Sequence, residues 1–175
     1  MSKNVAVVAV NPVNGMGLFQ YLEAFHEHQI SFKVFAVAPS REIRTNSGMA
    51  LTVDGVIADL KGHENEFDAL VFACGDAIPV FAQHASEPWN QDLMAVLKRF
   101  GEQDKLMIGH CAAGLMFGMA GVGTGRKVAV HPMVKAVVQG PVATDAPSEI
   151  DGNYFTAQQE HAIPTMIDRV VEALQ

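Results

Sequence analysis

The sequence predicts an α/β fold in which a mostly parallel β-sheet is covered by helices on both faces. The runs 5–10 and 69–73 are apolar at every position, as strands are when both faces of a parallel sheet are buried. Amphipathic segments lie between such runs; in 90–101, Leu93 and Val96 stand at the spacing of a helix that buries one face. Alternation of strands and helices along the chain is typical of this class of fold.

The same patterns predict each element in chain order. Asn11 and Pro12 end the first strand, because proline donates no backbone hydrogen bond to a sheet. Apolar runs and helical periodicity define the remaining elements. Strands are expected at 5–10, 32–37, 69–73, 106–109 and 153–157, with a short edge strand at 51–53 and a short piece at 128–130. Helices are expected at 16–28, 90–101 and 112–119, and a brief helical or irregular piece begins at 58–60. A C-terminal helix, with Pro164 in its first turn, is marked by Ile163, Ile167, Val170, Val171 and Leu174.

Length, charge and cysteine content narrow the class of protein. A chain of 175 residues is expected to form one domain, 1–175. The net charge of −7, spread along the chain, argues against nucleic-acid binding. No run approaches the roughly 20 apolar residues of a membrane-spanning helix, and we expect no secretory leader. Two cysteines without metal-like spacing are typical of a reducing compartment, so a cytoplasmic location is expected.

The most informative segment surrounds Cys111. An apolar strand-like run, 106–109, leads to His110 and Cys111, and the small residues Ala112 and Ala113 then open a helical pattern. A strand, a sharp turn carrying the nucleophile and a helix form the arrangement called a nucleophile elbow. The positive end of the helix stabilises a thiolate. Cys111 is therefore the candidate nucleophile, although free cysteines are also among the most buried residues of ordinary cores.

Four segments resemble the ThiJ/PfpI superfamily, which includes the parkinsonism-associated deglycase and is related to class I glutamine amidotransferases. Residues 67–75 resemble the superfamily's strand and glycine loop, and 109–114 resemble its cysteine elbow. Residues 125–132 resemble the segment that ends in a histidine, and 151–158 resemble its last strand. The four occur in the superfamily's order and span nearly the whole chain.

The resemblance implies a flavodoxin-like three-layer sandwich and a homodimer. It also implies a range of activities: glyoxalase-like conversion of 2-oxoaldehydes, isocyanide hydration, peptidase activity, chaperoning and redox sensing in stress. No cofactor and no metal site are implied, and the partner is expected to be a small-molecule substrate, with no nucleic acid and no membrane. The peptidase branch carries a histidine directly after the cysteine, where this chain has Ala112, so peptidase activity is disfavoured.

Three further residues complete the candidate site. The backbone N–H groups of Ala112 and Gly75 would stabilise an oxyanion, because a tetrahedral intermediate needs two preorganised donors. Gly75 would otherwise be a turn glycine with positive φ. His131 matches the superfamily histidine near the cysteine and would accept the thiol proton and return it to product; the alternative is a hydrogen-bonded histidine that ends a strand.

The chain departs from the superfamily where a first-helix carboxylate usually points at the sulfur. Our alignment places Gly17 at or near that position, and no acid occurs before Glu23. Asp76, Glu160 or a partner subunit would have to replace the missing carboxylate. Alternatively, Gly15 and Gly17 would open extra volume beside the sulfur or let a loop approach a ligand.

Cys74 stands where the superfamily usually has glycine. The sequence leaves two roles open for it: a small buried thiol that fills a turn, or a resolving thiol that pairs with Cys111.

The sequence supports three functional hypotheses. The first is a cysteine enzyme acting on a small electrophilic, carbonyl-type substrate by glyoxalase-like, deglycase-like or hydrolase chemistry. The second is a redox-responsive protein in which Cys111 is oxidised. The third is a scaffold without catalysis.

Overall fold

The computed structural model describes residues 2–175. Its main sheet has seven strands in the order β10-β11-β7-β6-β1-β2-β5, and β10 alone runs antiparallel to its neighbour, β11. The mostly parallel sheet confirms the predicted fold class. The strands are β1 Asn4–Val10, β2 Ser31–Val37, β5 Gly55–Val56, β6 Ala69–Ala73, β7 Leu106–His110, β10 Ser148–Asp151 and β11 Tyr154–Ala157.

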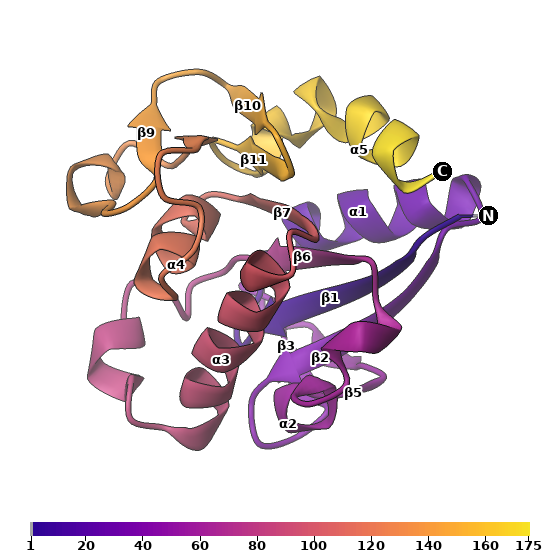
Figure 1. The fold of residues 1–175 in the computed structure, drawn as a ribbon. Coiled ribbons are helices and arrows are strands. Elements are labelled where there is room, and N and C mark those ends of the chain that lie inside the picture. Colours follow the sequence, from indigo (N-terminus) through magenta and orange to yellow (C-terminus); the bar gives the residue numbers. More distant parts are fainter. Residues whose placement is uncertain (1) are drawn as a thin grey trace.

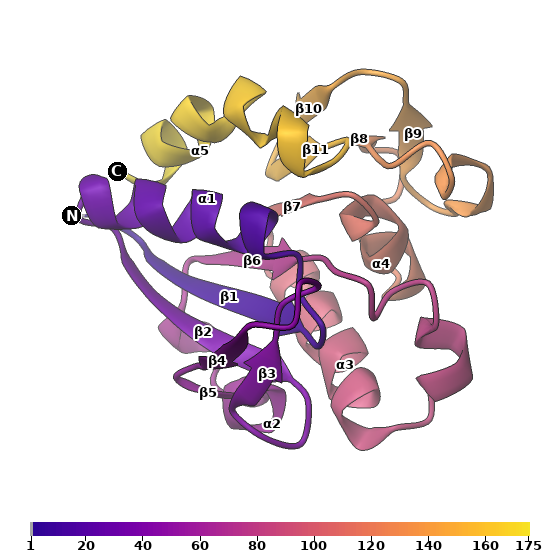
Figure 2. The ribbon, with the colours of Figure 1, turned by 180° about the vertical axis from the view of Figure 1, so that it is seen from behind.

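Helices cover both faces of this sheet, giving the three-layer sandwich (Figure 1; Figure 2 from behind). The helices α1 (Gly15–Glu27) and α5 (Ile167–Leu174) lie on one face. On the other lie α2 (Ile57–Leu60), α3 (Pro88–Glu102) and α4 (Ala113–Met119). The 3-10 helices are η1 Glu64–Glu66, η2 Phe81–His84, η3 Lys135–Val137 and η4 Glu160–Thr165.

Strand β1 shows how the sequence builds two cores. Successive side chains of a strand point to opposite faces of the sheet. Val5 and Val7 therefore pack with the apolar side of α1, and Ala6 and Val8 pack against α3. All four are fully buried. This double burial explains why the run 5–10 is apolar at every position.

Helix α1 begins where Asn14 caps it. The Asn14 side chain accepts a hydrogen bond from the Gly17 N–H at 2.6 Å, which satisfies one of the free donors at a helix start. Leu18, Tyr21 and Phe25 follow at helical spacing and are buried against the sheet. The cap and this apolar face fix the first turn of α1 beside the carboxyl end of β1.

Several short elements differ in detail from the sequence-based expectations. The run 51–53 forms β4 (Ala50–Thr52), which pairs with β3 (Glu42–Arg44) outside the main sheet. The run 128–130 forms β8 (Lys127–Ala129), paired with β9 (Val142–Thr144). The placement of Pro164 in the first turn of the C-terminal helix was wrong: Pro164 lies inside η4, and α5 begins at Ile167.

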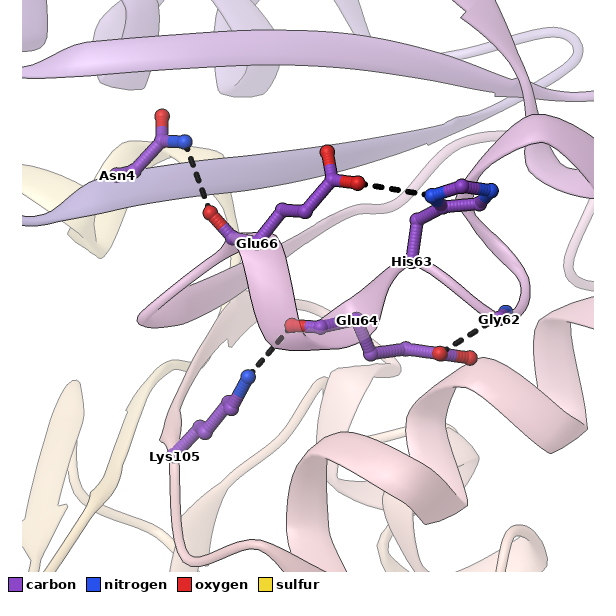
Figure 3. Close-up of polar contacts among 6 residues, drawn as sticks. All are labelled: Asn4, Gly62, His63, Glu64, Glu66 and Lys105. Atoms are coloured by element: carbon purple, nitrogen blue, oxygen red, sulfur yellow. Dashed lines mark hydrogen bonds and ion pairs between the residues drawn. The ribbon is translucent and has the colours of Figure 1, made fainter.

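At the end of the sheet away from the cysteines, Lys105 ties the loop before β6 to the start of β7 (Figure 3). Its ammonium group donates to the carbonyl oxygens of Glu64 and Phe67, the latter at 2.6 Å. The Glu64 carboxylate accepts the N–H of Gly62 at 2.9 Å. Partial burial lowers the pKa of Lys105. These contacts hold β6 and β7 side by side from their first residues.

No helix between residues 2 and 175 has the length and apolar character needed to cross a bilayer.

Candidate active site

Cys111 occupies the turn between β7 and α4 with φ of 60°, a left-handed conformation that is uncommon for any residue except glycine. Its N–H donates to the Ala157 carbonyl at 3.0 Å, and its carbonyl accepts the His131 N–H at 2.9 Å. The end of β11 and the segment after β8 thus hold the strained residue from both sides. This geometry is that of the predicted nucleophile elbow.

Small residues around the elbow are required by close packing, as the sequence suggested. A methyl group added at Gly109 would collide with the Ala113 side chain and approach the Phe72 carbonyl. A methyl group at Gly114 would meet the side chains of Val128 and Val130. Helix α4 can therefore leave the strand sharply, directly after Cys111.

The two cysteines lie at the carboxyl ends of neighbouring strands. Strands β6 and β7 are paired in parallel, and Phe72 is opposite Gly109 in the last pair of the ladder. Cys74 is buried and Cys111 is partly exposed. Their side chains influence each other's ionisation, with Cys74 acting as the hydrogen-bond donor that favours the thiolate of Cys111.

This interaction shifts the pKa values of the two thiols in opposite directions. The hydrogen bond from Cys74 is the largest influence on Cys111 and lowers its pKa, and the Ala112 N–H acts in the same sense. Burial and the negative charges of Glu160 and Asp76 oppose that shift without reversing it. For Cys74, the same hydrogen bond, burial and the charge of Cys111 raise the pKa well above its usual value. Cys111 is therefore the thiol that ionises first.

The predicted backbone donors lie beside both cysteines. The N–H groups of Gly75 and Ala112 favour the thiolate of Cys74, and the Ala112 N–H also favours that of Cys111. All four residues line the same pocket. Cys74, which the sequence left open, thus lies next to the groups expected to bind an oxyanion.

Gly75 is required for a different reason than positive φ. Its φ lies outside the left-handed region, and an added Cβ would collide with the Pro12 carbonyl and the backbones of Val13 and Asn14. The Asn14 N–H also donates to the Cys74 carbonyl at 2.9 Å. The absence of a side chain at Gly75 thus lets the β1–α1 loop pack directly on the Cys74–Gly75 peptide.

A pocket of about 600 Å³ opens in front of the two cysteines. All four predicted site residues, Cys111, His131, Gly75 and Ala112, line it. The structure therefore brings together the residues that the sequence singled out. Other lining residues are Asn14, Asn46, Cys74, Asp76, Ile78, Pro79, His110, Leu115, Met133, Val134, Gln159 and Glu160.

Comparison with known proteins places this site in a family. The sequence matches the DJ-1/PfpI family over residues 3–173. The chain belongs to this family. It is 65% identical, over the full 175 residues of both chains, to Protein ppBat of Bacteroides thetaiotaomicron. A crystal structure from that bacterium, provisionally described as protease I, is 64% identical with a TM-score of 0.99, covering 99% of this chain and 100% of that chain. Neither name specifies a cysteine-dependent reaction.

More distant DJ-1/PfpI structures share the fold. Drosophila melanogaster DJ-1beta has a TM-score of 0.84 at 18% identity, covering 99% of this chain and 91% of that chain. A DJ-1 superfamily protein of Salmonella typhimurium has a TM-score of 0.84 at 21% identity, covering 98% and 90%. The sandwich and its strand order are thus those of the DJ-1/PfpI family.

Within this family fold, His131 stands at the rim of the pocket. Its Nδ1 accepts the Met133 N–H at 3.2 Å. The neutral ring therefore carries its proton on Nε2. In that tautomer His131 offers a proton donor, so its geometry suits the return of a proton to product better than its removal from the thiol.

The place of the missing first-helix carboxylate is taken by His110. A side chain at Gly17 would collide with the His110 imidazole at Nε2 and Cε1. The expectation that Gly17 opens extra volume was therefore wrong, because the ring fills that space. His110 is 1% exposed, and its Nδ1 lies 3.3 Å from the Tyr21 hydroxyl. Its Nε2 is buried and has no hydrogen-bond partner among residues 2–175.

Burial controls the protonation of this pair. It lowers the pKa of His110 to about 4 and raises that of Tyr21 well above its usual value. Both groups are therefore neutral near pH 7. The sequence analysis did not identify His110 as a site residue. The available signal was the combination of Gly17, where the superfamily has a carboxylate, and a histidine directly before the nucleophile.

The remaining candidates for the missing acid lie at the pocket rim. Asp76 is exposed and Glu160 is partly buried, and both act on Cys111 through their negative charge. No group of three or more His, Cys, Asp or Glu side chains within residues 2–175 could hold a metal ion.

We predict that Gly75→Ala destabilises the protein by about 1–3 kcal/mol, because the added Cβ meets backbone atoms that cannot move independently. Urea unfolding followed by circular dichroism measures the change. Gly15→Ala is the matched control: its Cβ would meet only the Thr45 side chain, at 3.3 Å, and should cause a smaller loss or none. Equal stability of Gly75→Ala and wild type would contradict the proposed packing.

We predict a pH dependence of stability that originates at His110. The unfolded chain binds a proton there near pH 6.5 and the folded chain only near 4. Stability from this residue is therefore complete above pH 6.5 and falls by about 3 kcal/mol as the pH drops toward 4. Urea unfolding between pH 7 and 4 should show a shallower decline for His110→Gln than for wild type. Parallel curves for the two proteins would contradict the assignment.

Proposed function

We propose that this protein is a cysteine-dependent enzyme that acts on a small, uncharged, electrophilic carbonyl compound. The observation that carries this proposal is the Cys111 thiol: it has a lowered pKa and is held at φ of 60° on a strand-to-helix turn that borders a pocket. A strained, partly exposed thiol of low pKa is the arrangement of a nucleophile rather than of a core cysteine.

The first step would be addition of the Cys111 thiolate to the carbonyl carbon. A carbon–sulfur bond forms, and the carbonyl π electrons move onto oxygen, which becomes an oxyanion. The N–H groups of Gly75 and Ala112, which line the same pocket as Cys111, would stabilise the charge. The Cys74 thiol, which lines that pocket too, would either turn aside or donate its own S–H to the oxyanion.

Proton return is assigned to His131. The tautomer set by the Met133 N–H puts a hydrogen on Nε2, and His131 lines the same pocket as Cys111. A donor at this rim can protonate the developing oxyanion or its rearranged product. Buried and neutral, His110 would shape the inner wall of the pocket.

The charges at the rim indicate the class of substrate. Asp76 and Glu160 both oppose the negative charge of the Cys111 thiolate, and they would repel an anionic ligand in the same way. The pocket of about 600 Å³ suits a small molecule. A neutral 2-oxoaldehyde therefore fits better than a 2-oxo acid.

A redox-responsive function is the second candidate, favoured by one specific observation. The low-pKa thiol of Cys111 lies directly beside a second thiol, Cys74. Thiolate character and partial exposure are also the features that make a cysteine sensitive to peroxide.

We predict that Cys111→Ala abolishes turnover of a panel of small carbonyl compounds led by methylglyoxal, because the remaining thiol at the pocket, Cys74, is buried and has a raised pKa. Substrate loss is followed by chromatography, and circular dichroism checks that the variant is folded. Within the panel, neutral aldehydes should be converted faster than the matching 2-oxo acids. A folded Cys111→Ala protein that keeps wild-type turnover would refute the covalent mechanism.

A further inference from the structure

We propose that Cys74 is the resolving thiol of Cys111, so that oxidation of Cys111 by a hydroperoxide ends in a reversible Cys74–Cys111 disulfide within one chain. The inference rests on the reactive Cys111 of the proposed function. It makes Cys74 a second modification site and gives the site an oxidised state in which the Cys111 sulfur is bonded and cannot attack a substrate.

The two cysteines lie just beyond the last pair of two neighbouring strands. Phe72 is opposite Gly109 where the parallel ladder of β6 and β7 ends, and Cys74 and Cys111 each follow that pair by two residues. Neighbouring strands lie about 4.8 Å apart, and disulfides join Cα atoms about 4.4–6.8 Å apart. Both cysteines also line the same pocket, so their positions favour a bridge within one chain.

The backbones at both ends of the bridge are fixed by hydrogen bonds. The Cys74 carbonyl accepts the Asn14 N–H at 2.9 Å. The Cys111 N–H donates to Ala157 at 3.0 Å, and the Cys111 carbonyl accepts from His131 at 2.9 Å. The two thiols also lie close enough to influence each other's ionisation.

Exposure sets the order of the steps. Cys74 is 2% exposed, whereas Cys111 is partly exposed at the pocket. A dissolved oxidant therefore meets Cys111 first. Cys111 is also the thiol that ionises more readily, and the thiolate is the form that attacks a peroxide.

Formation of the disulfide takes two steps. The Cys111 thiolate attacks one oxygen of the hydroperoxide; the O–O bond breaks, Cys111 becomes a sulfenic acid, and the other oxygen leaves, after protonation, as alcohol or water. The Cys74 sulfur then attacks the Cys111 sulfur. An S–S bond forms, the S–O bond breaks, and the hydroxyl leaves as water with the Cys74 proton. One hydroperoxide is reduced, two thiols are oxidised, and an external dithiol reverses the reaction.

The surroundings of Cys74 change in favour of the second step. Two of the effects that hold the Cys74 thiol protonated, the hydrogen bond to Cys111 and its charge, come from the Cys111 thiolate. Oxidation of Cys111 to a neutral sulfenic acid removes that negative charge. The N–H groups of Gly75 and Ala112 remain, and both favour the thiolate of Cys74. Burial still disfavours the thiolate of Cys74, but the two effects of Cys111 no longer add to it once Cys111 is oxidised.

The test treats the reduced protein with two equivalents of hydrogen peroxide per chain, the amount that formation of a sulfinic acid requires, alkylates remaining thiols with iodoacetamide under denaturing conditions and maps the peptides without reduction. We expect the peptides of Cys74 and Cys111 to be joined, both thiols to disappear together, and dithiothreitol to restore both. In the matched variant Cys74→Ala, Cys111 should instead gain two oxygens as a sulfinic acid that dithiothreitol does not reverse.

Two results would overturn the inference: a Cys111 sulfinic acid in wild type with Cys74 still free, or bridges that join two chains on a non-reducing gel. If Cys74→Ala does not fold, the wild-type peptide map and thiol count decide alone. Alkylation of native, unoxidised protein separates the two proposals. If Cys111 reacts with iodoacetamide but no bridge forms, this inference fails and the proposed function stands. If Cys111 does not react, both fail.

Discussion

The site depends on the contact between two sulfur atoms at the ends of adjacent parallel strands. The pairing of β6 and β7 brings Cys74 beside Cys111, and the elbow at φ of 60° turns the Cys111 thiol toward the pocket. The thiol–thiol hydrogen bond makes one cysteine more acidic and the other less acidic. The Gly75 and Ala112 amides act at the same place. The proposed nucleophilicity, oxyanion stabilisation and redox chemistry all depend on this arrangement of the two cysteines.

Close packing of the surrounding backbone keeps the two cysteines in place. Gly109 and Gly114 let α4 leave the strand sharply, and Gly75 lets the β1–α1 loop pack on the Cys74 peptide. At the other end of the sheet, Lys105 holds the starts of the same two strands together. The positions of the sulfurs are thus set by backbone packing at both ends of β6 and β7.

The sequence predicted the features that depend on local pattern. Uniformly apolar runs identified the parallel strands, and the small residues after His110 identified the elbow. Gly75 and Cys111 were expected together because both follow strands at the carboxyl end of the parallel sheet, where sites form. Ala112 was expected as the residue after the nucleophile, and His131 came from the resemblance to the superfamily. Features that depend on contacts between distant segments were not predictable. Gly17 indicated a missing side chain, but only the packing of α1 on β7 shows that His110 fills the space. Likewise, nothing local to Cys74 reveals that it lines the pocket together with Gly75 and Ala112.

The most direct test of this account is an ultraviolet titration of thiolate absorbance in wild type, Cys111→Ala and Cys74→Ala. The account predicts that wild type has one thiolate that forms below the usual cysteine pKa. That signal should vanish in Cys111→Ala and move to higher pH in Cys74→Ala, because the variant lacks the hydrogen-bond donor. A wild-type thiolate that forms at or above the usual pKa, or one that Cys74→Ala leaves unshifted, would contradict the central role of the contact between the two sulfurs.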